Sequence, residues 1–160
     1  MPTAIIVDKQ LDITTKKILS IGWNFNTIII DLVPNSSGYI VLPNSFLSVD
    51  STNAANNYVM RDWKLFNRDD NTYKFNDAEE CKVIENIVFD DIPFAYANYI
   101  IELASLSSYI NIIGNTADVS VRQVLVNNAR IEALKDNARS IDGNILSDTF
   151  VTSLLSRDSL

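Results

Sequence analysis

Two kinds of hydrophobic pattern are segregated along this chain, and that order constrains the fold more than any other feature. Short β-branched and aromatic stretches, separated by turn residues, occupy residues 26–89, whereas long apolar stripes at helical spacing occupy residues 94–143. Alternating strand and helix units are absent, which argues against a parallel sheet. The order therefore predicts an α+β fold, with an N-terminal helix, an antiparallel β-sheet with a hairpin, and then two long antiparallel helices.

The first two helices are indicated by apolar spacing and by end signals. A helix is expected over residues 8–21, with a sparse stripe and Gly22 just beyond its end. A second is expected over Phe94–Ile113, with Asp90 or Asp91 as its cap and Pro93 near its first turn. The apolar arc of this second helix is wide enough to be buried on more than one side. The stripes of the two helices consist of Leu11, Ile18 and Ile21, and of Tyr96, Tyr99, Ile100, Leu103, Leu106 and Ile110.

A third helix is expected to begin at Thr116 or Asp118 and to end at Gly143. Its predicted core-facing stripe is Val121, Val124, Leu125, Asn128, Ile131 and Leu134. Residues 1–143 are therefore interpreted as a single α+β domain. Residues 144–160 are a partly amphipathic tail, which we expect either to form a short helix or to become ordered only on a partner.

The strands are predicted from β-branched and aromatic runs between turn residues. A hairpin is expected in which Trp63–Phe66 pairs with Thr72–Phe75 around a turn at residues 67–71, because those five residues are all Asn, Asp or Arg. The other predicted strands are Thr27–Val33, Tyr39–Leu42, Phe46–Val49 and Cys81–Phe89.

The composition excludes several classes of function. The chain has no histidine, which removes Ser-His-Asp and Cys-His triads and most zinc or non-haem iron sites. Its one cysteine, Cys81, has no imidazole base to activate it and is predicted to be structural. The four glycines are too scattered for a phosphate-binding loop, and the net charge of −7 argues against nucleic acid as the main ligand. No stretch is apolar enough to indicate a membrane span, and no cofactor is expected.

Two pairs of neighbouring acids leave an enzymatic hypothesis open. Asp69 with Asp70, or Asp90 with Asp91, are conceivable as a catalytic pair or an oxygen-rich metal site. The simpler interpretation, which we favour, is a turn for the first pair and a helix cap for the second.

Aromatic and basic residues gather in the predicted hairpin. Trp63 and Phe66 lie close in sequence to Arg61, Lys64 and Arg68. Such a mixture can stack on single-stranded nucleic acid, but the acidic balance of the chain disfavours that. It is equally typical of a protein-protein hot spot, or of a sheet packed on helices without a partner.

Four sequence segments, taken in order, carry a combined pattern: Ile18–Asn26, Gly38–Asn44 followed by Leu47–Asp50, Arg61–Arg68 with Thr72–Phe75, and Phe89–Pro93 with Tyr99–Ile100. Each is a short pattern of turn and core residues, and the specificity comes from their order over about half the chain. Together they resemble the tail tubular protein A family of short-tailed bacteriophages. The N-terminal helical region is shorter than in that family, and the tail after Gly143 has no clear counterpart.

The resemblance implies a structural virion protein with no catalytic, cofactor-binding or metal-binding residues. Family members are head-to-tail connector subunits, so it implies a dodecameric ring between the portal protein and the downstream tail or nozzle protein. DNA would pass through the channel without specific binding, and the protein would be made in the host cytoplasm. The alternative is a monomeric protein-binding module that uses the Trp63 hairpin. The candidate interface residues are Arg61, Trp63, Phe66, Arg68, Tyr73, Phe89, Asp90, Pro93, Phe150 and Leu154.

Overall fold

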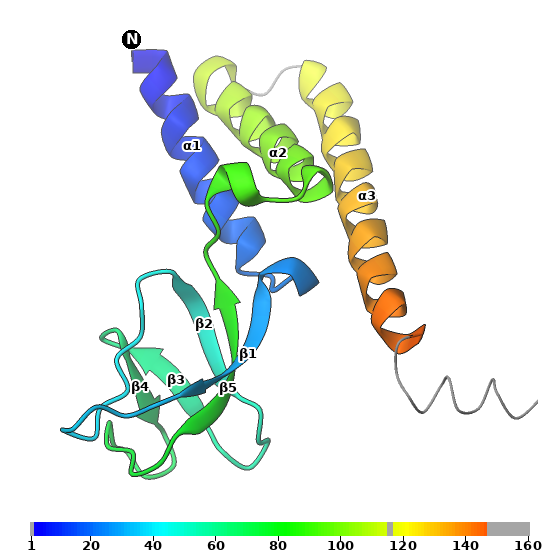
Figure 1. Ribbon diagram of the computed structural model, residues 1–160. Helices are drawn as coiled ribbons and strands as arrows, with labels where there is room; N and C mark the ends of the chain where they lie inside the picture. Colours follow the sequence, from blue (N-terminus) through cyan, green and yellow to red (C-terminus); the bar gives the residue numbers. More distant parts are fainter. Residues whose placement is uncertain (1, 115–116, 147–160) are drawn as a thin grey trace, which may run out of the picture. The chain divides into compact units, whose positions relative to one another are not determined.

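A computed structural model describes residues 2–114 and 117–146, and it has the predicted α+β class (Figure 1). An N-terminal helix is followed by antiparallel strands and then by two long helices that run in opposite directions. The chain divides into two compact units, which are treated separately: a sheet unit, Ile13–Asp91, and a helical unit, Met1–Asp12 with Ile92–Leu160. The prediction of one domain over residues 1–143 remains a prediction.

The elements follow the sequence pattern closely in some places and depart from it in others. The helices are α1 (Pro2–Leu19), α2 (Phe94–Ile113) and α3 (Asp118–Leu146), with short 3₁₀ helices η1 (Asn24–Asn26) and η2 (Phe89–Asp91). The strands are β1 (Thr27–Leu32), β2 (Phe46–Ser51), β3 (Tyr58–Arg61), β4 (Lys64–Asn67) and β5 (Glu79–Glu85).

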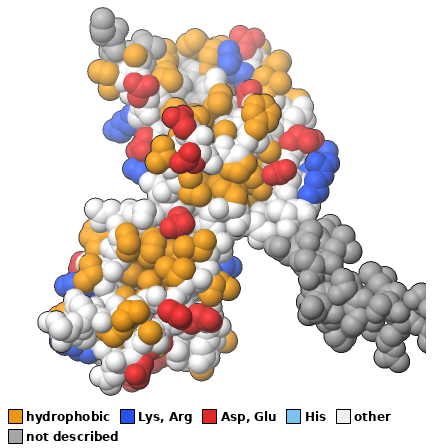
Figure 2. Space-filling view, viewed as in Figure 1, with side chains coloured by type: hydrophobic (Ala, Val, Ile, Leu, Met, Phe, Trp, Pro, Cys, Tyr) orange, Lys and Arg blue, Asp and Glu red, His pale blue; other side chains and the backbone are white. Residues whose placement is uncertain are grey.

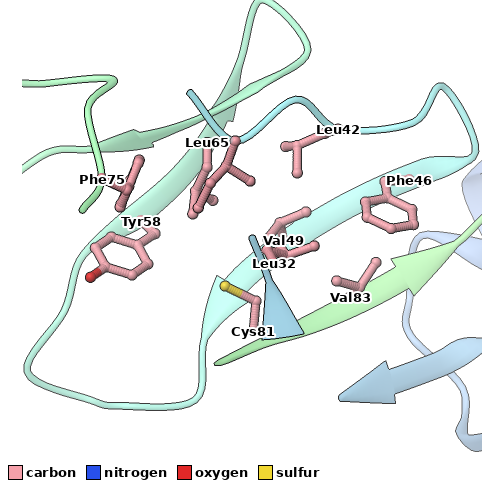
Figure 3. Packing of buried hydrophobic residues seen from close by; sticks show 10 residues of the cluster. Leu32, Leu42, Phe46, Val49, Tyr58, Leu65, Phe75, Cys81 and Val83 are labelled. Atoms are coloured by element: carbon pink, nitrogen blue, oxygen red, sulfur yellow. The ribbon is translucent and has the colours of Figure 1, made fainter. Parts of the chain in front are cut away.

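The sheet unit has two small antiparallel sheets around one core. In the larger sheet β5 lies in the middle, paired with β1 on one side and β2 on the other, and β3 pairs with β4 in the smaller one. Cys81 and Val83 of β5 and Leu65 of β4 have no exposed surface. Figure 3 shows side chains from both sheets meeting in this core. The whole cluster is Leu32, Ile40, Leu42, Phe46, Val49, Tyr58, Leu65, Phe75, Cys81 and Val83.

The predicted hairpin is wrong in its pairing. β4 pairs with β3, not with Thr72–Phe75, and the two strands are joined by the two-residue turn Asp62-Trp63. The predicted turn at residues 67–71 exists, but only an isolated bridge between Asn67 and Thr72 closes it. The reason is local: Asn67 Oδ1 accepts the N–H groups of Asp69 and Asp70, and this Asx-type turn needs no following strand.

Other boundaries also differ. Residues 39–42 form isolated bridges rather than a strand, with Tyr39 opposite Lys74 and Val41 opposite Lys64. β5 begins two residues before the predicted start and ends at Glu85, and Phe89, the last residue of the predicted strand, belongs to the 3₁₀ helix η2. Neither Asp90 nor Asp91 caps α2; Pro93 occupies that position, with no side-chain cap.

The two outer helices also depart from prediction at their ends. α1 begins six residues before the predicted start, and a proline at its first position is favourable there. α3 continues through Gly143 to Leu146, so Gly143 does not end it. Ile21, placed in the first stripe, lies beyond α1 and is 58% exposed. The rest of the predicted tail, residues 147–160, lies outside the described residues.

A buried asparagine joins the end of α1 to the sheet. Asn26 has no exposed surface, and its side chain makes three hydrogen bonds. Its Nδ2 donates to the Leu19 carbonyl at 3.0 Å and to the Glu85 carbonyl at 2.8 Å, and its Oδ1 accepts the Trp23 N–H at 2.9 Å. Trp23 Nε1 in turn donates to the Ile18 carbonyl. Gly22 allows the sharp exit from α1, since its φ is +78°.

In the helical unit, the predicted core-facing stripe of α3 faces outward instead. α2 and α3 pack on each other, and α3 buries Val126, Ala129 and Ala133. Small side chains allow two helices to approach closely, and this contact decides which face of α3 is inside. The stripe residues are left 46–63% exposed where they are large and apolar: Val121, Val124, Leu125, Ile131 and Leu134.

Two further contacts fix α2 to α3. The guanidinium of Arg122 lies 4.3 Å from the ring centre of Tyr109, whose hydroxyl donates to Asp118 at 3.2 Å. Burial, together with the charge of Asp136 and a hydrogen bond to it, raises the pKa of Tyr96 to about 12. Tyr96 therefore stays a neutral donor to α3. No helix among the described residues is long and apolar enough to span a membrane.

Candidate functional site

The tip of the β3–β4 hairpin is held in an unusual backbone conformation. Asp62 and Trp63 have φ values of +51° and +56°, the left-handed region that two-residue hairpin turns require. Glycine and asparagine adopt this conformation readily, whereas a tryptophan in it costs about 1–2 kcal/mol. The Trp63 side chain is nevertheless 50% exposed, so the ring does not repay that cost by burial. Strain at an exposed aromatic residue is a reason to look for a function there.

The hairpin predictions come together in space. The Arg61 guanidinium lies 4.7 Å from the ring centre of Phe66, and the rings of Phe66 and Tyr73 are 4.7 Å apart. Arg61, Phe66 and Arg68 line a concavity of about 490 Å³, together with Val59, Met60 and Asn71. Tyr73 also reaches the turn, since its hydroxyl donates to Asp62 at 3.3 Å. The structure thus forms one cluster, the hairpin cluster: Arg61, Trp63, Phe66, Arg68 and Tyr73.

The members of the hairpin cluster differ in accessibility. Phe66 is 6% exposed and acts as the floor, whereas Arg61 and Arg68 are exposed at the rim. Trp63 lines a second, smaller concavity of about 380 Å³ with Met60 and Asp62. Exposed arginine and tryptophan around an apolar floor are the residue types that dominate protein-protein hot spots.

The remaining candidates lie elsewhere. Phe89 and Asp90 are in η2, and Pro93 immediately precedes α2. In Figure 1, η2 follows the end of β5 that lies away from the hairpin. Phe150 and Leu154 lie outside the described residues. The interface prediction therefore divides into a hairpin cluster and a separate segment around residue 90.

The paired acids have local structural partners. Asp69 accepts the Asn57 N–H at 3.0 Å, and Asp70 accepts the side-chain amide of Asn67 at 2.9 Å. Among the described residues no group of three acidic or cysteine side chains is close enough to hold a metal ion. The structure therefore gives the first pair a turn-stabilising role.

The single thiol is held in the sheet core. Burial, together with the nearby carboxylates of Glu79 and Asp50, raises the pKa of Cys81 to about 11. Burial also raises the pKa of Tyr58 to about 12, aided by its hydrogen bond to Glu79 at 2.9 Å. A thiol with that pKa is almost entirely protonated near neutral pH, so it is a poor nucleophile.

The raised pKa values of Cys81 and Tyr58 predict that the protein loses stability at alkaline pH. Their ordinary pKa values are 9.0 and 10.0, so the folded state holds both protons more tightly than the unfolded state does. The stabilisation is complete below about pH 9 and is lost as the pH rises through about 11 for Cys81 and about 12 for Tyr58. Urea unfolding from pH 8 to 11.5 should show this fall. The fall in unfolding free energy should be smaller in Cys81→Ala and in Tyr58→Phe than in wild type. If the unfolding free energy fell equally steeply with pH in all three proteins, the raised pKa values of Cys81 and Tyr58 would be contradicted.

Two features were missed by the sequence patterns. Asn26 appears in the sequence analysis only as the last residue of the segment Ile18–Asn26. Its position directly after Trp23 and Phe25 is the signal that could have marked it as buried. The outward apolar stripe of α3 was recognised as a stripe but assigned to the core. A competing pattern of small residues, with alanine at positions 129 and 133, was present in the sequence.

Comparisons with known proteins agree with the resemblance noted in the sequence. A family model described as tail tubular protein matches residues 1–142. A curated protein named tail tubular protein A, from Klebsiella phage KP34, is 23% identical over 117 residues, which is 73% of this chain. The aligned part is 63% of that relative's length.

Proposed function

Because the chain belongs to the tail tubular protein family, we propose that it is a head-to-tail connector subunit that assembles with other copies into a ring. Family membership makes it a structural protein of the phage tail and a component of the virion. In the proposal the ring is a dodecamer that lies between the portal protein and the downstream tail protein and surrounds the DNA channel. The role is assembly, with no catalytic step.

The hairpin cluster is the observation in this structure that best supports docking to another tail component. A strained, half-exposed tryptophan beside two rim arginines is costly for an isolated subunit. It is useful when a partner covers the ring and removes water from the guanidinium groups. A monomeric binding module would use the same surface, so the hairpin alone does not separate the two functions; the copy number in the particle does.

Replacing Trp63 tests the docking role without disturbing the core. In Trp63→Ala we expect at least a tenfold loss of incorporation into particles, as for a hot-spot tryptophan worth about 2 kcal/mol or more. Its unfolding free energy should stay within about 1 kcal/mol of wild type, since half the side chain is exposed. Incorporation is measured as copies per particle, and stability by urea unfolding.

A second variant keeps this test decisive. Trp63→Gly removes the ring and also relieves the positive φ, so it should raise the unfolding free energy by about 1 kcal/mol while still losing incorporation. A Trp63→Ala protein that fails to fold would show that Trp63 belongs to the core. Normal incorporation of both variants would show that the hairpin tip is not a docking surface.

A further inference from the structure

The smaller sheet turns a set of basic side chains away from the core. Side chains alternate along a strand, so Leu65 of β4 points into the core while its neighbours Lys64 and Phe66 point outward. On the paired strand, Arg61 lies directly opposite Lys64. Arg68 follows β4 and lines the same concavity as Arg61 and Phe66. We call Arg61, Lys64 and Arg68 the basic face; Phe66 is its floor.

The charges of the basic face are not balanced by ion pairs. Within the part of the chain that the structure describes, none of its three cations forms an ion pair with a carboxylate. Asp62, Asp69 and Asp70 flank the face, and their carboxylates accept hydrogen bonds from neutral groups of the sheet unit. Like charges directly opposite each other on two strands are destabilising, as Arg61 and Lys64 are. A partner with negative charge would relieve this repulsion.

The outer face of the larger sheet has the opposite charge. Cys81 of β5 points into the core, so Glu80 and Lys82 point outward. Asp31 of β1 lies directly opposite Glu80, and Asp50 of β2 lies opposite Lys82. We call the exposed carboxylates of Asp31, Glu80 and Asp50 the acidic face. These three carboxylates outnumber the single amine of Lys82, and Asp31 with Glu80 is again a like-charged pair across two strands.

The basic and acidic faces belong to opposite sides of the sheet unit. The two sheets turn their inner side chains to one core (Figure 3), so their outer faces point away from each other. Figure 2 shows one side of this unit, on which acidic side chains lie beside hydrophobic ones while basic side chains appear toward the outline. A closed ring joins two different surfaces of each subunit, and these two faces meet that requirement.

We propose that the basic face of one copy of this chain docks on the acidic face of a second copy. The inference rests on the proposed ring and names the partner of the hairpin cluster, to which Arg61, Phe66 and Arg68 belong. Each face carries a repelling pair of like charges, and each supplies the charge that the other lacks. Arginine binds carboxylates through two parallel hydrogen bonds, which suits Arg61 and Arg68 to this contact. Nucleic acid suits the basic face less well, because the net charge of −7 repels phosphate.

Exchanging the charges of the two faces tests this contact in particles. Arg61→Glu/Lys64→Glu reverses the basic face and Asp31→Lys/Glu80→Lys reverses the acidic face. Each should lower the copy number per particle about tenfold or more, because like charges then face each other between subunits. The protein with all four substitutions should recover to within about threefold of wild type, since each reversed face again meets its opposite. All three variants keep a like-charged pair across the strands, so the purified subunits should unfold near the wild-type urea midpoint.

A matched control separates the face from the net charge of the chain. Arg130→Glu/Arg139→Glu makes the same change in charge at two exposed arginines of α3. This control should enter particles as wild type does. A loss as large as that of Arg61→Glu/Lys64→Glu would show that net charge controls incorporation, and it would overturn the inference.

Carbodiimide coupling of wild-type particles gives a second readout that needs no substitution. The reagent joins a lysine amine to a carboxylate that touches it. We expect mass spectrometry to find the peptide containing Lys64 joined to a peptide containing Asp31 or Glu80. In particles assembled from isotopically light and heavy subunits, the two joined peptides should come from different copies.

The remaining outcomes overturn the inference and leave the ring standing, provided that the wild-type copy number is unchanged. One is normal incorporation of Asp31→Lys/Glu80→Lys; another is a folded four-substituted protein that stays outside the particle. Coupling of Lys64 only to a different tail protein would assign the basic face to that protein. Retention of labelled single-stranded DNA by wild type, but not by Arg61→Glu/Lys64→Glu, would assign the face to nucleic acid. If the wild-type chain were absent from particles or present as a single copy, the proposed function would fail as well.

Discussion

Asn26→Ala is expected to lower the unfolding free energy by about 3–5 kcal/mol. Three hydrogen bonds are lost together, and two of the abandoned partners are the carbonyls of Leu19 and Glu85. The methyl group of alanine makes none of these hydrogen bonds. Because Asn26 has no exposed surface, water takes the place of its amide only if the contact between the end of α1 and β5 opens. The loss is measured by equilibrium urea unfolding.

An exposed asparagine provides the control for this substitution. Asn76→Ala changes the same side chain on the surface of the sheet unit and should alter stability by less than about 0.5 kcal/mol. A loss below about 1 kcal/mol for Asn26→Ala would show that the joint between α1 and β5 does not depend on this amide.

Leu65→Ala should destabilise the sheet unit by about 2–5 kcal/mol. Leu65 has no exposed surface and belongs to the core that joins the two small sheets (Figure 3). Removing most of its side chain leaves a cavity that neighbouring strands fill only in part. Thermal or urea unfolding measures the effect.

A leucine outside the core shows whether burial is the cause. Leu125 of α3 is 47% exposed, so Leu125→Ala should cost less than about 1 kcal/mol in the isolated subunit. Similar losses for Leu65→Ala and Leu125→Ala would mean that the core has been assigned incorrectly.

Hydrophobic patterns, with a period of 2 residues for strands and 3.6 for helices, predict the parts of this fold that the local sequence determines. α2 was predicted to the residue, because Pro93 and Gly114 bracket a continuous apolar arc. β1 was predicted to within one residue, since Thr27–Leu32 is almost entirely β-branched or apolar. In both segments the end signals and the apolar pattern agree, so tertiary packing had nothing to override.

The strand that pairs with β4 and the face of α3 that is buried depend on packing partners elsewhere in the chain, which a local sequence pattern does not reveal. An Asp-Trp pair is a poor candidate for a two-residue turn, whereas the polar run at residues 67–71 has the composition of one. On α3, large apolar residues outweighed Ala129 and Ala133 in the pattern, but close helix packing selects small residues. The candidate hairpin residues stay a prediction, since arginine, tryptophan and tyrosine indicate a protein interface by residue type and not by how the strands pair.

The copy number of the chain in intact particles tests the central proposal most directly. Native mass measurement of tail complexes released from purified virions, together with a low-resolution image of the head-to-tail junction, gives both the number and the place of the subunits. The proposed function predicts many copies, twelve if the ring is dodecameric, in one closed layer between portal and tail. A chain that stays monomeric and never joins the virion, or that occurs there as a single copy, would contradict it.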